Sequence, residues 1–145
     1  MILISHRGNI NGRNKAAENT IASVREALDR GFDCEIDVWL EDRVWYLGHD
    51  EPQQAVSILF LRRHGLWCHA KNLAALDGLL KEGIIETFWH EKDERTLTSS
   101  GFIWTYPGKS LCSNSICVQF GPPIAGDNLP QVAGVCSDYI ERYSP

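Results

Sequence analysis

Four of the five histidines in this chain lie beside other ionisable residues, each time near the end of an apolar, strand-like stretch. These polar groups follow one another along the chain: His6-Arg7, Glu35 with Asp37, His49-Asp50, His69 with Lys71, and His90-Glu91. A single histidine is often only a core residue. Four at the ends of successive strands indicate one site, because chemistry collects at the carboxyl ends of strands in α/β sheets.

Glu35 and Asp37 are two residues apart, so on a strand both carboxylates point the same way. Two carboxylates aimed into one space repel each other unless a cation lies between them. The pair is therefore either an exposed polar face or the site of a hard divalent cation with oxygen ligands, Mg²⁺ or Ca²⁺.

The neighbouring residues suit a phosphate. Arg7 offers a planar fork of donors and Lys71 a point charge. His6 and His49 carry the side chain that transfers protons near neutral pH. A cation, two proton-transfer groups and phosphate-neutralising charges together describe the cleavage of a phosphodiester.

Apolar periodicity and turn residues predict the elements that must position these groups. Helices are expected over residues 20–30, 52–63 and 73–82, the last with a buried stripe of Leu73, Leu76, Leu79 and Leu80. Strands at 34–40 and 44–50 are separated by only three polar residues, which predicts a β-hairpin around residues 34–49. After residue 83 the pattern indicates short strands and loops, with Trp89 and Trp104 in the core.

Alternating strands and helices in the first half predict an α/β protein with a parallel sheet. Four motifs then resemble, in order and spacing, the glycerophosphodiester phosphodiesterase family of the phospholipase C-like phosphodiesterase superfamily: HRG at residues 6–8, ENT at 18–20, RGFDCEIDV at 30–38 and LGHD at 47–50. The resemblance fades after about residue 71. It implies a (β/α) barrel and a hydrolase of lipid metabolism that cleaves glycerophosphodiesters.

The resemblance also implies site roles. His6 and His49 match the acid–base pair, Glu35 and Asp37 match metal ligands, and Arg7 and Lys71 match the phosphate-binding positions.

His69 stands where the family has a third acidic ligand. Either His69 is itself a ligand, which would admit Mn²⁺, or the two carboxylates and water hold Mg²⁺ or Ca²⁺. Glu18 and Asn19 are expected to act structurally at the start of a helix. Asp138 matches the aspartate that commonly ends the family's last strand.

A complete eight-unit barrel takes about 250 residues, so 145 residues predict a reduced or incomplete TIM-like barrel with its helices mainly in the first half. We expect one phosphodiesterase-like domain over residues 1–145. Strand surface left without helices favours a homodimer.

Charge and composition indicate which kinds of partner and which cell compartment to expect. A net charge of −5 provides no basic field to attract nucleic acid. The chain has neither a run near the roughly 20 apolar residues of a membrane span nor a signal-peptide pattern. Five scattered cysteines indicate buried thiols in a reducing compartment. A cytoplasmic protein with a small phosphodiester substrate is the expectation.

Two other hypotheses stay open. A relative that binds a phosphorylated ligand without turnover would explain the missing third carboxylate, although it would not need two histidines. A metal-independent phospholipase C-like lyase is the other, because an arginine can take the place of the cation.

Overall fold

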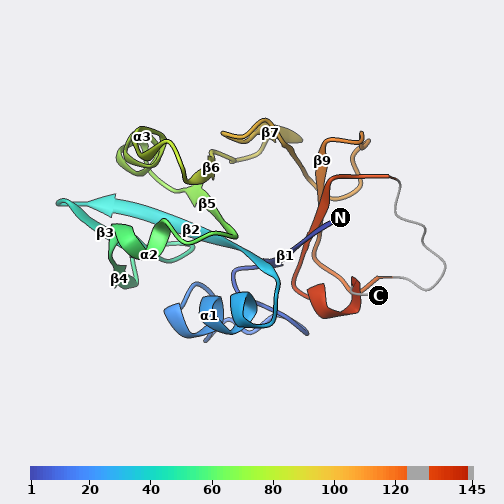
Figure 1. Cartoon of the computed structure of the whole chain (residues 1–145), viewed down its shortest axis with the longest axis horizontal. Coiled ribbons are helices and arrows are strands. Elements are labelled where there is room, and N and C mark those ends of the chain that lie inside the picture. The colour runs from blue at the N-terminus through green and yellow to red at the C-terminus, as the bar shows by residue number, and fades with distance from the viewer. Residues whose placement is uncertain (124–130, 144–145) are drawn as a thin grey trace.

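A single ten-stranded sheet, strongly curled, forms the body of the molecule (Figure 1). The computed structural model describes residues 1–123 and 131–143. The strands are β1 (Ile2–His6), β2 (Asp33–Glu41), β3 (Val44–Leu47), β4 (Gln54–Val56), β5 (Leu66–Ala70), β6 (Glu86–Phe88), β7 (Arg95–Leu97), β8 (Ile103–Thr105), β9 (Ser115–Gln119) and β10 (Gly134–Ser137).

The wall of this half-barrel is a run of parallel strands in the order β6-β5-β2-β1-β10-β9-β8, with β7 antiparallel to β8. The first and last strands of the chain, β1 and β10, are neighbours in the middle of this run, and β6 and β8 are its two ends. β6 approaches the loop between β7 and β8, because Ser99 N in that loop donates to Thr87 O in β6 at 2.8 Å. The sheet is therefore mixed and curled around an interior.

The predicted hairpin is confirmed. β2 is long enough to pair with β1 and β5 over its first part and then antiparallel with β3 from Val38 to Glu41. Asp42 and Arg43 make the turn with positive φ angles of 48° and 66°. The hairpin carries His49 back toward the carboxyl ends of the parallel strands.

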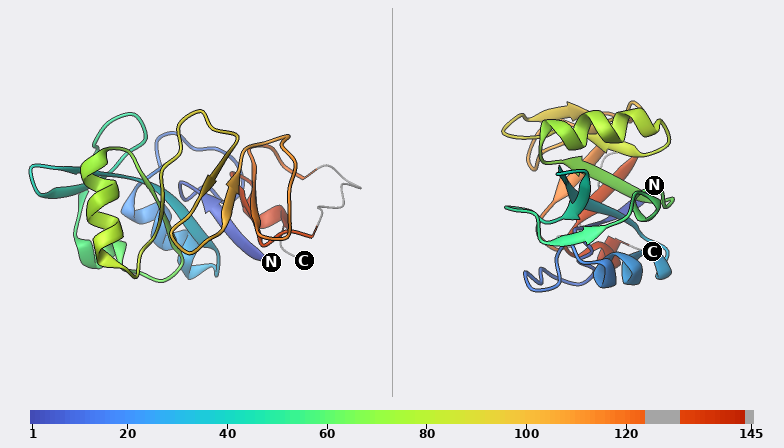
Figure 2. Two further views of the ribbon diagram at one scale, coloured as in Figure 1. Left: turned by 90° about the horizontal axis from the view of Figure 1, so that it is seen from above. Right: turned by 90° about the vertical axis from the view of Figure 1, so that its left-hand side faces the viewer.

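Helices cover the outer face of the sheet, and within the described part of the chain the α-helices all precede residue 83 (Figures 1 and 2). They are α1 (Ile21–Asp29), α2 (Ile58–Leu61) and α3 (Leu73–Glu82), followed much later by the 3₁₀ turn η1 (Ile140–Tyr143). Thr20 caps α1 and Asn72 caps α3, and Gly83 ends α3 in the left-handed region. Cys34, Ile36 and Val38 of β2 pack against this layer.

The opposite side chains of the strands fill the interior. Alternation along each strand sends these residues inward, and they form a separate apolar cluster of Ile4, Trp67, Phe88, Trp104, Ile116, Val118 and Cys136. The interior is thus packed with side chains from strands on every side of the curl. One step further toward the carboxyl ends, the inward residues become polar.

Two sequence predictions about helices are wrong. Residues 52–63 are not one helix, because 54–56 form β4 on the edge of β3 and α2 begins only after the Ser57 cap. The leucine stripe is wrong in part: Leu79 is fully buried and Leu76 packs against the core, but Leu73 is 74% and Leu80 52% exposed. The helix instead turns Gly78 toward the hairpin, where an added Cβ would lie 2.7 Å from the Trp45 ring.

Candidate functional site

The inward polar residues meet in one cavity of about 430 Å³ at the carboxyl ends of the parallel strands. The site residues expected from the sequence line it, apart from Asp37, which lies fully buried beneath. The lining ones are His6, Arg7, Glu35, His49, His69 and Lys71. The structure therefore brings together groups that are separated by up to 65 residues of chain, from His6 to Lys71.

Asp37 is the centre of the polar cluster. Asn19 holds it twice, donating from Nδ2 to Asp37 Oδ2 and accepting from the Asp37 backbone N–H, both at 2.9 Å. His49 Nδ1 and Arg7 Nε each lie 3.1 Å from the same Oδ2. Burial alone would raise the pKa of Asp37, but the contacts with His49 and His69 and the charge of Arg7 hold that pKa well below its usual range. Asp37 is therefore ionised.

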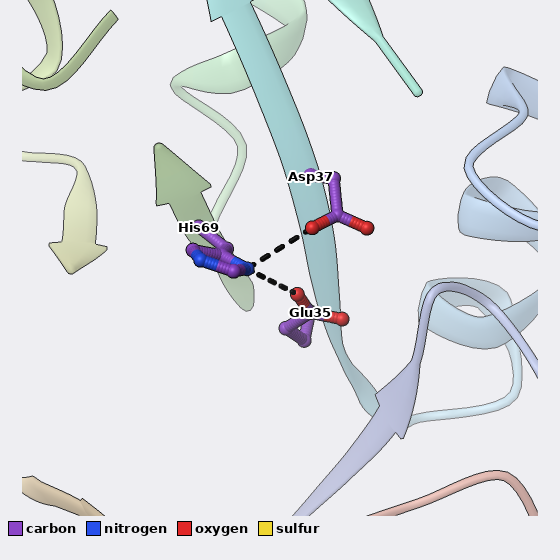
Figure 3. A group of neighbouring side chains, drawn as sticks. All are labelled: Glu35, Asp37 and His69. Carbon is purple, nitrogen blue, oxygen red and sulfur yellow. Dashed lines mark ion pairs between the residues drawn. The ribbon is translucent and has the colours of Figure 1, made fainter. Parts of the chain in front are cut away.

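Glu35, Asp37 and His69 form a cluster that could hold a metal, with candidate ligand atoms all within 4.8 Å of one another (Figure 3). His69 Nδ1 lies 3.0 Å from Asp37 Oδ1 and 3.8 Å from Glu35 Oε1. The other ring nitrogen, Nε2, donates to the His90 carbonyl at 2.8 Å. With Nε2 held by this carbonyl, Nδ1 is the ring nitrogen that faces the carboxylates, the orientation that metal-bound histidines usually have.

Two further features fit a cation at this cluster. Asp37 Oδ1 is buried and makes no hydrogen bond of good geometry to the described part of the chain, although His69 Nδ1 lies 3.0 Å and Lys71 Nζ 3.5 Å from it. Burial, followed by the charge of Asp37, raises the pKa of Glu35. A divalent cation would bind this oxygen directly and relieve the repulsion between the two carboxylates.

Each of the two histidines has its Nδ1 on a carboxylate. His6 Nδ1 donates to Asp138 Oδ1 at 2.8 Å, and His49 Nδ1 donates to Asp37 Oδ2. The Nε2 atoms are left for other partners: that of His6 lies 3.9 Å from Glu35 Oε2, and that of His49 accepts from Arg7 Nη2 at 3.3 Å. In both rings Nδ1 is thus the nitrogen held by a carboxylate, and Nε2 is the nitrogen that could exchange a proton with another group.

Burial and pairing act in opposite directions on the His6–Asp138 pair. Burial alone would lower the pKa of His6, but the hydrogen bond to Asp138 and the charge of Glu35 raise it above its ordinary value. Burial alone would raise the pKa of Asp138, but the bond and charge of His6 lower it. Asp138 is 3% exposed and holds His6. The structure therefore brings the aspartate that follows the last strand into the site.

The turn after β1 explains the HRG motif. Arg7 has a φ of 55° and Gly8 a φ of 83°, and a Cβ at Gly8 would lie 2.5 Å from Ser23 Oγ. Only glycine fits there. The turn aims Arg7 at Asp37, with Nη1 3.5 Å from Glu18 Oε2.

Asn9 is a residue of the site that the sequence analysis missed. Its Nδ2 donates to Asp138 Oδ1 at 2.8 Å and to Glu18 Oε1 at 3.1 Å, while its Oδ1 accepts from Asn14 N. Asn9 therefore links Asp138, which holds His6, to Glu18, which holds Arg7. Its position directly after HRG was the available signal, but asparagine in a loop is ordinary turn chemistry.

Glu18 and Asn19 have a different structural role from the one expected. Thr20 caps α1, whereas Asn19, at a φ of 55°, turns its side chain to Asp37. Glu18 binds Arg13 at 2.8 Å as well as Arg7. Both side chains therefore hold charged residues of the site, Asp37 and Arg7, and neither caps the helix.

The remaining wall of the cavity is aromatic. Trp89, Tyr106 and Phe120 line it together with His90. Trp104 is 5% exposed and belongs to the apolar interior as expected, although it also contributes to the lining of the cavity. Trp89 is partly buried against the outer cluster and also reaches the cavity. The cavity therefore has one charged and one aromatic wall.

The chain's cysteines are all free thiols, and Cys34, Cys68, Cys117 and Cys136 are buried as expected. Within residues 1–123 and 131–143, no helix has the length and apolar character needed to cross a membrane. No family model, curated protein or solved structure matches the chain.

Proposed function

We propose that this protein is a metal-dependent phosphodiesterase with a reduced TIM-like barrel, similar to the glycerophosphodiester phosphodiesterases, in which His6 and His49 form the acid–base pair. One observation carries the proposal: the two histidines, each fixed on a carboxylate, line one cavity with Arg7 and Lys71. A cytoplasmic location and a homodimer stay predictions.

In the proposed reaction, the Nε2 of one histidine takes the proton of the nucleophile, which is water or a neighbouring hydroxyl of the substrate. The nucleophile attacks phosphorus, the bond from phosphorus to the leaving oxygen breaks, and the other histidine gives that oxygen a proton. Asp138 and Asp37 keep the two rings oriented and stabilise each imidazolium.

Arg7 and Lys71 bind the phosphate. Both line the cavity, and their side chains are only 12% and 18% exposed. Their charges are therefore weakly screened and stabilise the negative charge that grows on the phosphoryl oxygens. Glu18 and Asp37 hold the Arg7 guanidinium in position before substrate arrives.

Glu35, Asp37 and His69 would hold the metal ion. The buried Asp37 Oδ1, which lacks a hydrogen bond of good geometry, and the orientation of His69 Nδ1 support this ligand set. Two oxygens and one imidazole nitrogen suit Mn²⁺ in addition to Mg²⁺ or Ca²⁺. When bound, the ion would supply positive charge that offsets the negative charge growing on the phosphoryl group.

The test is turnover of a panel of phosphodiesters by the purified protein, before and after EDTA, with Mg²⁺, Ca²⁺ and Mn²⁺ added back singly. The proposal predicts cleavage that EDTA abolishes and one of these ions restores. Binding of phosphorylated ligands without turnover under any condition would instead identify a binding protein. Cleavage that EDTA does not affect, with a cyclic phosphate as product, would identify a metal-independent lyase.

A further inference from the structure

The aromatic wall of the cavity takes no part in the proposed chemistry. Tyr106 is 43% and Phe120 44% exposed, although both line a cavity rather than an open surface. Large apolar rings exposed inside a concave site mark the surface that a ligand covers. The wall therefore indicates what kind of group the substrate carries next to its phosphate.

The rings of this wall are arranged as stacked pairs. Tyr106 lies 5.5 Å from His90 with planes only 14° apart, and two residues earlier on the same strands Phe88 lies 4.5 Å from Trp104 at 26°. Phe120 meets Tyr106 at 5.9 Å and 75° and closes the wall toward His6. A flat group placed against Tyr106 would extend this pattern of stacking.

Other substrate groups fit the wall less well. His90 Nε2 already donates to the Asp93 carbonyl, so this nitrogen is not available as a donor to a polyol. Arg7 and Lys71 line the cavity against Glu35 and Glu91, so no excess of negative charge adds to the cation–π attraction that the rings alone offer a quaternary ammonium. The wall ends at the exposed charged residues 91–94, too polar a surface for a long acyl chain.

We infer that this wall binds a planar aromatic group carried on one alcohol of the phosphodiester, with a nucleobase as its biological form. The inference rests on the proposed function and narrows its substrate class to nucleoside phosphodiesters. A cavity of about 430 Å³ lies within the usual range for small ligands. Hydrolysis adds water across one bond between phosphorus and oxygen, giving a phosphomonoester and an alcohol.

The test is equilibrium binding of two phosphomonoesters, adenosine 5′-monophosphate and glycerol 3-phosphate, to the intact protein by calorimetry. We expect the adenosine compound to bind at least about tenfold more tightly, the effect of one stacked base. Tyr106→Leu should remove this preference and leave glycerol 3-phosphate unchanged, whereas Tyr106→Phe should retain it. The matched control is Tyr46→Leu, because Tyr46 lies on β3 outside the cavity lining.

Equal affinity for the two ligands would overturn the inference. So would tighter binding of phosphocholine or octyl phosphate than of the adenosine compound, or an equal loss in the Tyr106 and Tyr46 variants. Phe120→Leu replaces the Tyr106 variant if that protein does not fold. Turnover of bis(p-nitrophenyl) phosphate separates the two proposals: turnover without adenosine preference rejects only this inference, and preference without turnover under any metal rejects only the proposed function.

Discussion

The two walls of the cavity are held in different ways. On the side of β1, β2 and β5, buried charged groups depend on partners from separate segments, as Asp37 does on Asn19 and His6 does on Asp138. On the side of β6, β8 and β9, rings pack directly on rings. A buried charge needs hydrogen bonds at fixed positions, whereas an aromatic ring needs only a complementary shape. The charged wall accordingly lies where α1 and the loop before it reach the site.

The largest expected effect concerns the two histidines of the charged wall. His6→Ala and His49→Ala should each lower kcat on an alkyl phosphodiester by on the order of 10²–10⁴, the contribution of a positioned proton-transfer group. Substrate binding should change much less, since Arg7 and Lys71 remain. The histidine that acts as the acid will show a smaller loss with a p-nitrophenol leaving group.

His64→Ala is the matched control for these variants. His64 is exposed and lies at the opposite end of the sheet, in the loop before β5. Its replacement should leave kcat unchanged. A similar loss in all three histidine variants would mean that the effect is one of folding rather than of proton transfer.

The aromatic side of the molecule should instead be sensitive to the removal of a packed ring, and Phe88 is such a ring in the apolar interior next to the aromatic wall. Phe88 is 2% exposed between His69 and Trp104. Phe88→Ala should lower the free energy of unfolding by about 3–5 kcal/mol, as for other buried phenylalanines. Urea denaturation should give the same loss at pH 5.5 and pH 8, because no charge is removed. A strongly pH-dependent loss would contradict the distinction between the walls.

Within the charged wall, Asp37 and Glu35 should contribute differently to the free energy of unfolding. Asp37→Ala leaves Arg7, His69 and Lys71 facing an empty position and should cost about 3 kcal/mol of unfolding free energy. Glu35→Gln should be neutral or stabilising at pH 7, because the raised pKa of Glu35 shows that its charge is disfavoured. Both variants should lose Mn²⁺ binding by calorimetry. Equal stability of the two variants would contradict the central place of Asp37.

The sequence was most informative on the strands, where side chains alternate between the two faces of the sheet and residues two apart must point the same way. Glu35 and Asp37, two residues apart, do point into one interior, and the order of strands does bring His6 and His69 to it. Sequence reasoning failed at 52–63, where apolar residues compatible with a helix pair with the edge of β3 instead. It also missed Asn9, because its two partners lie 9 and 129 residues away and no local pattern records them.

The smallest expected effect concerns Asp138. Asp138→Asn replaces the carboxylate on His6 Nδ1 by a neutral amide, which holds the imidazolium less strongly, so that the pKa of His6 should fall, as measured by NMR titration of the ring. The pair stabilises the fold above the ordinary pKa of an aspartate, about 4, because the folded pKa of Asp138 is lowered. On the side of His6, the stabilisation of the fold by this pair is complete below about pH 6.5, the ordinary pKa of a histidine. It is lost as the pH rises through the raised pKa of His6. The stability difference between the two proteins should therefore be greatest between about pH 4 and 6.5.

In the proposed mechanism, His6 and His49 act on one phosphorus in opposite protonation states. The decisive measurement is the pH dependence of kcat/KM for an alkyl phosphodiester with the restoring metal present. We expect a bell-shaped profile in which His6→Ala removes one limb and His49→Ala removes the other. A profile with a single limb in the unmodified protein, or loss of the same limb in both variants, would contradict it.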